Sequence, residues 1–434
     1  MGDNWSKESN SIFERFAAGI DDAVGKGEVL KDADRDLQYG IRLQNERLSR
    51  RGIEYSYDLS PRGYSYNGLE LGSHWSDGRY ENRLEVRSCL KQERFSKNGR
   101  ILFKKKQNAK IFQTVTDVKN PADVAEDEYV CPDCGAVTKV GLLIDGCPYC
   151  RNQFRMDELY PKISNYYFYP DVGGTSKELG RMAIPTILIT ILVVYLPFLL
   201  FGGILLFVGR MQSASNPYQA MQTTGNGIGI LISGIFIALF VGIIGGWLIT
   251  TGIYLFRFGA FAADRIPMAK YLGCQKEFED LMKQSTPEFS YEFFAGKAIS
   301  FIRMLIFSEN PEDLPFYNGG PTDPSCKEIV DVISMGCVGI TKTEIDNGYV
   351  YVHADVYLED TYDSNGRIRR VKDVWKVVMK KNIARPVNFG FRITGIHCPF
   401  CAGSFDATRS RTCPYCSNPF RMEDLDWSVE SLSR

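Results

Sequence analysis

The sequence lacks an excess of charge of either sign. Its 434 residues include 51 Lys and Arg against 52 Asp and Glu, which gives a formal net charge of -1. This balance disfavours a strongly basic nucleic-acid-binding chain. The 12 cysteines are too few, in so long a chain, for a small disulfide-rich scaffold. An apolar fraction of 44% excludes a disordered polar protein, and the length favours about three structural units.

Familiar catalytic motifs are also missing. The sequence has no complete Gly-rich phosphate loop, no nucleophile elbow and no His-based motif for a catalytic metal. Gly25-Lys26-Gly27 stands alone and is better explained as a break between two helices, predicted over residues 9–20 and 32–50. We therefore expect no enzyme.

Two long segments contain no charged residue. Their apolar parts, residues 183–208 and 228–256, exceed the ~20 residues that a helix needs to cross hydrocarbon. A buried soluble helix of this length and composition is the weaker alternative. Gly242 and Gly246 are spaced so that the two helix backbones can approach closely. We predict a transmembrane helical hairpin.

Charges beside these segments predict their orientation. The segment that connects them, residues 209–227, is polar and is expected to be a loop with one positive charge, Arg210. The outer flanks carry Lys177, Arg181, Arg257, Arg265 and Lys270. The positive-inside rule therefore predicts a multi-pass protein of the cell membrane with both termini in the cytoplasm.

Eight of the cysteines form four CxxC pairs in two groups. The first group is Cys131, Cys134, Cys147 and Cys150, and the second is Cys398, Cys401, Cys413 and Cys416. Tight turns in such pairs direct two thiolates at one metal, and four sulfur ligands in a tetrahedron suit zinc. Because four cysteines leave no open coordination position, we expect two structural Zn²⁺ ions in two zinc ribbons.

Other chemistry is possible for a CxxC pair. Redox-active pairs and disulfides are the alternatives, and iron is a chemically possible metal. Two doublets with matched spacing on the reducing side of a membrane favour zinc over disulfides.

The second halves of the two ribbons repeat one another. Residues 147–159 and 413–425 are identical at nine of 13 positions. Asn98-Gly99 and Asn365-Gly366 predict hairpin turns, and each glycine precedes the first cysteine of its ribbon by 32 residues. We infer an internal repeat, a sheet followed by a ribbon, although coincidence of common turn residues is the alternative.

The C-terminal half has the clearer pattern. A helix over about residues 286–308 with a broad apolar face precedes three strands, residues 329–343, 349–361 and 367–380. This order predicts an α+β fold with helices packed on a curved antiparallel sheet. The predicted segments in chain order are an N-terminal helical segment 1–50, a β-rich region 51–130 that is a divergent copy of the C-terminal domain, ribbon 131–160, membrane helices 183–208 and 228–256, domain 264–385 and ribbon 396–427.

This C-terminal half resembles a known family. The helix containing Phe289-Ser-Tyr-Glu-Phe-Phe294, the three-stranded meander, the membrane helices and the ribbons are similar to bacterial membrane proteins with a Tim 44-like domain. That domain is similar to part of an anchor of the mitochondrial import motor. The resemblance covers residues 264–385 and the ribbon arrangement. It implies a cone-shaped, nuclear-transport-factor-two-like fold, docking at a membrane and recruitment of protein partners.

A basic run suggests a second partner. Residues 94–110 contain seven positive charges and no negative one, namely Arg94, Lys97, Arg100, Lys104, Lys105, Lys106 and Lys110. Near an anionic leaflet each could contribute about 1 kcal/mol of binding. An ordinary solvated strand edge is the equal alternative. The leading hypothesis is a membrane-anchored cytoplasmic scaffold or adaptor that docks unidentified protein partners, with anionic lipid as a further ligand and no nucleic acid.

The alternative hypothesis is a small-ligand or enzymatic pocket in the C-terminal domain. His353, Asp355 and Glu359 share one strand face and could perform acid–base chemistry. Alternation along a strand places such neighbours together without any function. The direction in which this face points distinguishes the two hypotheses.

Overall fold

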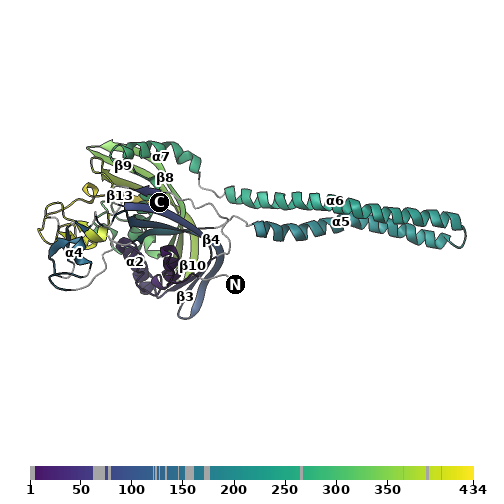
Figure 1. The fold of residues 1–434 in the computed structure, drawn as a ribbon, viewed down its shortest axis with the longest axis horizontal. Helices are drawn as coiled ribbons and strands as arrows, with labels where there is room; N and C mark the ends of the chain where they lie inside the picture. The colour runs from purple at the N-terminus through teal and green to yellow at the C-terminus, as the bar shows by residue number, and fades with distance from the viewer. Residues whose placement is uncertain are drawn as a thin grey trace. The chain divides into compact units, whose positions relative to one another are not determined.

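A computed structural model describes residues 5–61, 74–76, 80–120, 122, 125–126, 128–131, 134–144, 146–151, 161–170, 176–263, 267–364, 366–387, 391–401 and 403–434. The chain forms two compact units. One contains Met1–Asp171 together with Ile266–Arg434, and the other is Val172–Arg265 (Figure 1).

The N-terminal half of the larger unit places two helices beside an antiparallel sheet. The helices are α1 (Ile12–Ala23) and α2 (Arg35–Arg51). The strands are β1 (Glu54–Pro61), β2 (His74–Ser76), β3 (Tyr80–Lys97), β4 (Arg100–Val118) and β7 (Lys162–Pro170). The strand order is β1-β3-β4-β7, with β2 beside β3. Strands β1 to β4 lie within residues 51–130, and β7 is an additional strand that was not predicted.

The C-terminal half repeats this plan. Helices α7 (Met268–Lys283) and α8 (Tyr291–Phe307) precede β8 (Ile329–Asp346), β9 (Tyr349–Ser364), β10 (Arg367–Asn382) and the closing strand β13 (Ser428–Ser433). The strand order is β13-β10-β9-β8. Alternation in β9 buries Val350, Val352 and Val356 completely, as the sequence predicted.

Short elements surround the two cysteine clusters. The first lies beside β5 (Glu128–Val130), β6 (Val137–Lys139) and α4 (Val140–Leu143), and the second beside β11 (Ile396–His397) and β12 (Ser404–Phe405). The 3-10 turns are η2 (Pro311–Asp313), η3 (Pro324–Glu328), η4 (Ile393–Gly395), η5 (Ala407–Arg409) and η6 (Met422–Asp424).

Both halves therefore share one order of elements. In each half two helices precede the antiparallel strands, a cysteine cluster follows the last of these strands, and one further strand returns to pair with it. The short strand β2 has no counterpart in the C-terminal sheet. Asn98 and Gly99 join β3 to β4 with positive φ values of 51° and 75°, as an Asn-Gly hairpin turn requires. Gly366 also has a positive φ, 79°, whereas Asn365 lies outside the described residues. So do residues 152–160, which carry part of the repeated sequence.

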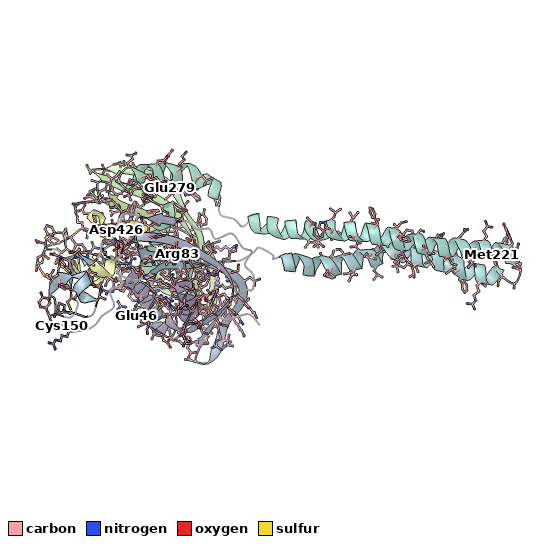
Figure 2. The ribbon with its side chains drawn as sticks, in the orientation of Figure 1. Glu46, Arg83, Cys150, Met221, Glu279 and Asp426 are labelled. Atoms are coloured by element: carbon pink, nitrogen blue, oxygen red, sulfur yellow. The ribbon has the colours of Figure 1, made fainter. Side chains whose placement is uncertain are left out.

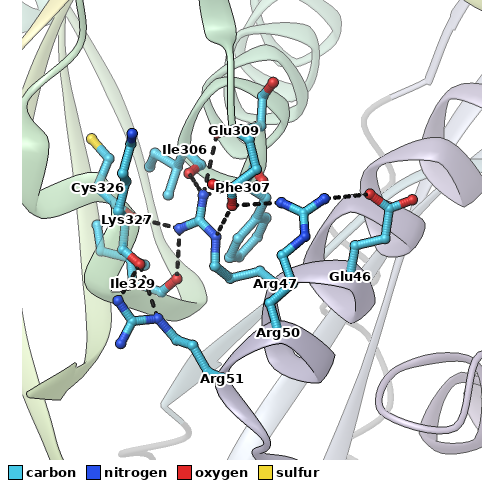
Figure 3. A network of polar contacts seen from close by, with 11 residues as sticks. Glu46, Arg47, Arg50, Arg51, Ile306, Phe307, Glu309, Cys326, Lys327 and Ile329 are labelled. Carbon is cyan, nitrogen blue, oxygen red and sulfur yellow. Dashed lines mark hydrogen bonds and ion pairs between the residues drawn. The ribbon is translucent and has the colours of Figure 1, made fainter. Parts of the chain in front are cut away.

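The two halves are interlocked by a buried arginine. Arg47 of α2 donates to the carbonyl oxygens of Ile306, Phe307 and Ser308 at the end of α8, at 3.2 Å each (Figure 3). Its Nε also lies 2.9 Å from Glu309. The C-terminal carbonyls of a helix lack intrahelical partners and carry partial negative charge, so a guanidinium satisfies both needs. The predicted segments 1–50, 51–130 and 264–385 accordingly pack into one unit.

The smaller unit is a hairpin of two helices, α5 (Ser176–Gln212) and α6 (Pro217–Ala263). Residues Ala183–Gln212 and Pro217–Ile253 are long and apolar enough to cross a membrane, with a mean hydropathy of 2.7 in each. A Cβ added at Gly242 would lie 2.8 Å from the Cα of Ile191, and one at Gly246 would lie 2.6 Å from the Cα of Ile187. The predicted close approach of the backbones at these glycines is confirmed.

The expected loop over residues 209–227 is wrong. Both helices continue into this polar segment, and only residues 213–216 separate them. Pro217 occupies the first turn of α6, where its missing N–H costs nothing, and the Gln219 N–H donates to the side chain of Asn216 at 3.4 Å. Polar residues alone do not end a helix. The break between α5 and α6 instead lies where Asn216 caps α6 and Pro217 begins it. Met221 lies near this end of the hairpin (Figure 2).

Candidate metal centres

The first cysteine cluster is built on two tight turns. The Cys131 N–H donates to the Ala136 carbonyl, and the Gly135 N–H donates to the Cys131 carbonyl, both at 2.9 Å. In the second turn, the Arg151 N–H donates to the Cys147 carbonyl at 2.8 Å. Gly135 and Arg151 both have left-handed backbone conformations, with φ values of 72° and 61°. Arg151 occupies the position in the second turn that Gly135 occupies in the first, so both turns have the same geometry although one has arginine there.

The sulfur atoms of this cluster are spaced for a metal ion. The Sγ atoms of Cys131 and Cys150 are 3.7 Å apart, as are those of Cys134 and Cys147. All four lie within 4.8 Å of one another. Four sulfurs at ~2.3 Å from a tetrahedral zinc ion are about 3.8 Å apart, so the four thiols fit this ion. Cys150 is labelled in Figure 2.

The second cluster has the same geometry. The Sγ atoms of Cys398 and Cys416 are 3.6 Å apart, and those of Cys401 and Cys413 are 3.7 Å apart. The Cys413 N–H donates to the Asn418 carbonyl, and Ser417 has a φ of 59°, the counterpart of Arg151. Both predicted sets of four cysteines are therefore brought together.

Hydrogen bonds prepare the sulfur atoms for metal binding. The backbone N–H groups of Phe400 and Tyr415 lie 3.4 Å from the sulfurs of Cys398 and Cys413. Backbone N–H groups of Cys150 and Tyr149 lower the pKa of Cys147 to about 7, and the backbone N–H of Asn418 lowers that of Cys416 to about 7. In the same clusters, burial and neighbouring thiols raise the pKa of Cys134 and of Cys401. Metal binding requires deprotonated thiols, so a lowered pKa favours it at neutral pH.

The clusters are closed and partly built into the protein core. Cys131, Cys147, Cys398 and Cys413 are at most 3% exposed and belong to the same apolar cluster as α8. Four sulfur ligands leave no position for substrate or water. The chain thus contains two four-cysteine clusters that can each hold one metal ion in a structural role. Zinc is the ion that the donor set suits best, and its identity stays a prediction.

The basic run forms part of the β3–β4 hairpin. Arg94 and Lys104 are register partners and are exposed on one face, and Lys106 lies on the same face. Lys105 pairs with Glu93 on the opposite, buried face. The run is thus divided between two faces by strand alternation. Among the described residues, the seven basic side chains form no ion pair, and those on the exposed face, including Arg94, Lys104 and Lys106, are free to contact an anionic surface.

The residues of the enzymatic alternative lie on the other face of β9 from its buried valines. His353 Nε2 lies 3.3 Å from Glu344, and Asp355 accepts a hydrogen bond from the Tyr271 hydroxyl at 2.9 Å. Glu359 is half-buried on this face. The inner face of the sheet is filled by the buried valines and by Trp375. These three residues therefore face away from the sheet's packed interior, and the enzymatic hypothesis stays a prediction.

The buried charges between the halves were not predicted from the sequence. Arg370 of β10 makes two hydrogen bonds to Glu93 of β3, at 2.6 and 2.7 Å, and Lys91 lies 3.3 Å from Glu93. The signal that could have located them is charge at inward positions of alternating strands. Arg370 and Glu93 are more than 270 residues apart in the chain, so the sequence alone could not show that they form a pair.

Comparison of the chain with known protein families, with characterised proteins and with solved structures finds no match.

Proposed function

We propose that this chain is a membrane-anchored cytoplasmic scaffold, stabilised by two zinc ions, that docks protein partners at the inner leaflet. The main observation in support is that two closed four-cysteine clusters lie within one compact unit. The same chain has two helices long and apolar enough to cross a membrane. Closed clusters stabilise a surface without supplying chemistry. The resemblance to membrane proteins with a Tim 44-like domain supports the same proposal.

A surface for partners is available on the first ribbon. Val137, Leu142, Ile144 and Tyr149 are each more than half exposed around the metal cluster. Exposed apolar groups gathered on a rigid module are typical of protein interaction sites. We propose an apolar segment of a cytoplasmic protein as the occupant.

Proximity labelling from the full chain in its native host tests this proposal. The expected result is a set of soluble neighbours that disappears in the double variant Leu142→Ser/Ile144→Ser. Ile345→Ser, at an exposed apolar position of β8, is the matched control. A set of neighbours unchanged by the ribbon variant would contradict partner docking at this surface.

The proposed orientation has its own test. Cysteines introduced near either terminus should be protected from a membrane-impermeant thiol reagent in intact cells, and one at Ser213 between α5 and α6 should react. Reaction at the termini would overturn a cytoplasmic location.

Anionic lipid is the second proposed partner, through the exposed basic face of the β3–β4 hairpin. In nanodiscs containing anionic lipid, trypsin cleavage after Lys104 and Lys106 should be slower than in neutral nanodiscs. Added salt should abolish the difference, because salt screens these charges. Equal cleavage in both kinds of nanodisc at low salt would contradict binding of anionic lipid by this face of the hairpin.

A further inference from the structure

Arg303 differs from its counterpart in the other half. When α2 and α8 are aligned from end to end, Gly40 matches Gly296 and Arg47 matches Arg303. Arg47 donates to five backbone carbonyls and to Glu309. In the described part of the chain, the hydrogen bonds of Arg303 are limited to one at 3.4 Å, to the Tyr166 hydroxyl. A guanidinium has five N–H donors, so most N–H groups of Arg303 have no hydrogen-bond acceptor among the described residues.

A small cavity lies beside this arginine, between the two halves. Its volume is about 20 Å³. Its polar lining is Tyr55, Tyr57, Lys91, Tyr166, Tyr167, Arg303, Asp331 and Ser334. One water molecule needs ~10–15 Å³ of such space, so the cavity admits a water-sized species and excludes a phosphate or sulfate.

The charges around the cavity do not cancel. Three cations, Lys91, Arg303 and Arg370, accompany two carboxylates, Glu93 and Asp331. Glu93 is already shared by Arg370 and Lys91. Arg370 also lies 3.9 Å from Asp331. Asp331 acts on both Arg370 and Arg303, so the two carboxylates leave one positive charge of the three without a balancing negative charge.

The carboxylate of Asp331 is occupied by other donors. Gln44 Nε2 donates to its Oδ1 at 3.0 Å, and the Tyr55 hydroxyl lies 3.2 Å from its Oδ2. Arg303 is partly buried, and a charge withdrawn from water is costly unless it is balanced. A water molecule in the cavity would leave the charge in place. An anion would neutralise this positive charge and accept hydrogen bonds from the remaining N–H groups of Arg303.

We propose that this cavity binds one small monovalent anion of the halide class, with Arg303 as its principal ligand. Tyr57 and Tyr166 line the same cavity. Chloride has the size and charge required and is the abundant candidate. The bound anion stabilises the seam between the halves and is independent of the proposed scaffold function.

Thermal unfolding of the purified full chain tests the site. At fixed ionic strength, sodium chloride should give a higher melting temperature than sodium gluconate, with saturation, and bromide should replace chloride. Arg303→Gln should lose this chloride dependence, whereas Arg42→Gln, at an exposed position of α2, should keep it. Equal melting temperatures of the wild-type chain in the two salts, or a chloride response retained in Arg303→Gln, would overturn the proposal.

A second measurement does not depend on the variant's folding. Crystals of the wild-type chain soaked in bromide should show an anomalous peak in the cavity, beside the Arg303 guanidinium. An ordered water without anomalous signal at that position would show a hydrated cavity and contradict the anion site.

Discussion

Buried charged residues decide how the two halves are held together. The side chain of Glu93 is fully buried and that of Arg370 is 8% exposed. Burial raises the pKa of Glu93, but Lys91 and Arg370 outweigh it and hold the pKa below its usual value. The ion pair therefore depends on all three residues, and removing one leaves a buried charge without its partner.

Replacing Arg370 by Met should lower the free energy of unfolding by about 3–5 kcal/mol, the usual cost of breaking a buried ion pair. Urea titration of the full chain measures it. The neighbouring exposed Arg369→Met is the control and should change little. Because the pKa of Glu93 is lower in the folded state, its contribution is complete above its unfolded pKa of ~4.3 and is lost as the pH falls further. A loss in Arg370→Met no larger than in the control would contradict this account.

Asp360 should show the opposite pH dependence. Its side chain is completely buried, and its Oδ2 accepts a hydrogen bond from Trp375 Nε1 at 2.8 Å. Burial raises the pKa of Asp360 to about 7. A raised folded pKa means that the wild-type chain loses stability as the pH rises from ~4 towards 7. Asp360→Asn should remove this loss, and parallel pH profiles of melting temperature for the two proteins would show the assignment to be wrong.

At the scale of single elements, local patterns were sufficient where one face is buried. Alternation in residues 349–361 and the Asn-Gly turns located β8, β9 and β10 to within a few residues. Strands β7 and β13 were not predicted because each follows a cysteine cluster and is stabilised by pairing with a strand that lies far away in the sequence. The prediction of a loop over residues 209–227 was wrong because it rested on the polarity of this segment, and polar residues also continue a helix.

The helical hairpin makes a prediction about glycine. Gly242→Leu places a side chain where the backbone of α5 lies, so the two helices must separate. Gly252→Leu is the matched control, since no other atom lies within 4 Å of its added Cβ. Titration with SDS, followed by helix–helix energy transfer, should show earlier separation for Gly242→Leu. Equal midpoints for the two variants would contradict the packing of α5 on α6.

At the scale of the whole molecule, cysteine spacing predicted both clusters, and the donor chemistry follows from residue type alone. The spacing could not show that both clusters join one core. Cys131 and Cys147 pack in the same apolar cluster as Phe294 and Ile302 of α8. These contacts link residues more than 140 positions apart, a distance at which local periodicity carries no information.

Loss of one metal ion should therefore destabilise the entire larger unit. Cys131→Ser removes a ligand from a site whose binding free energy is about 10–16 kcal/mol in small zinc modules. Hydrogen exchange should rise in α8 as well as around the first cluster. Exchange confined to residues 128–151 would show that the ribbon unfolds separately and that it does not support the core.

Zinc content of the purified full chain tests the central claim most directly. Elemental analysis, with free thiols counted in the same sample, should give two zinc ions per chain and no disulfide among the eight cluster cysteines. Cys131→Ser and Cys413→Ser should each retain one ion. A metal-free wild-type chain whose cluster cysteines are joined in disulfides would contradict the account.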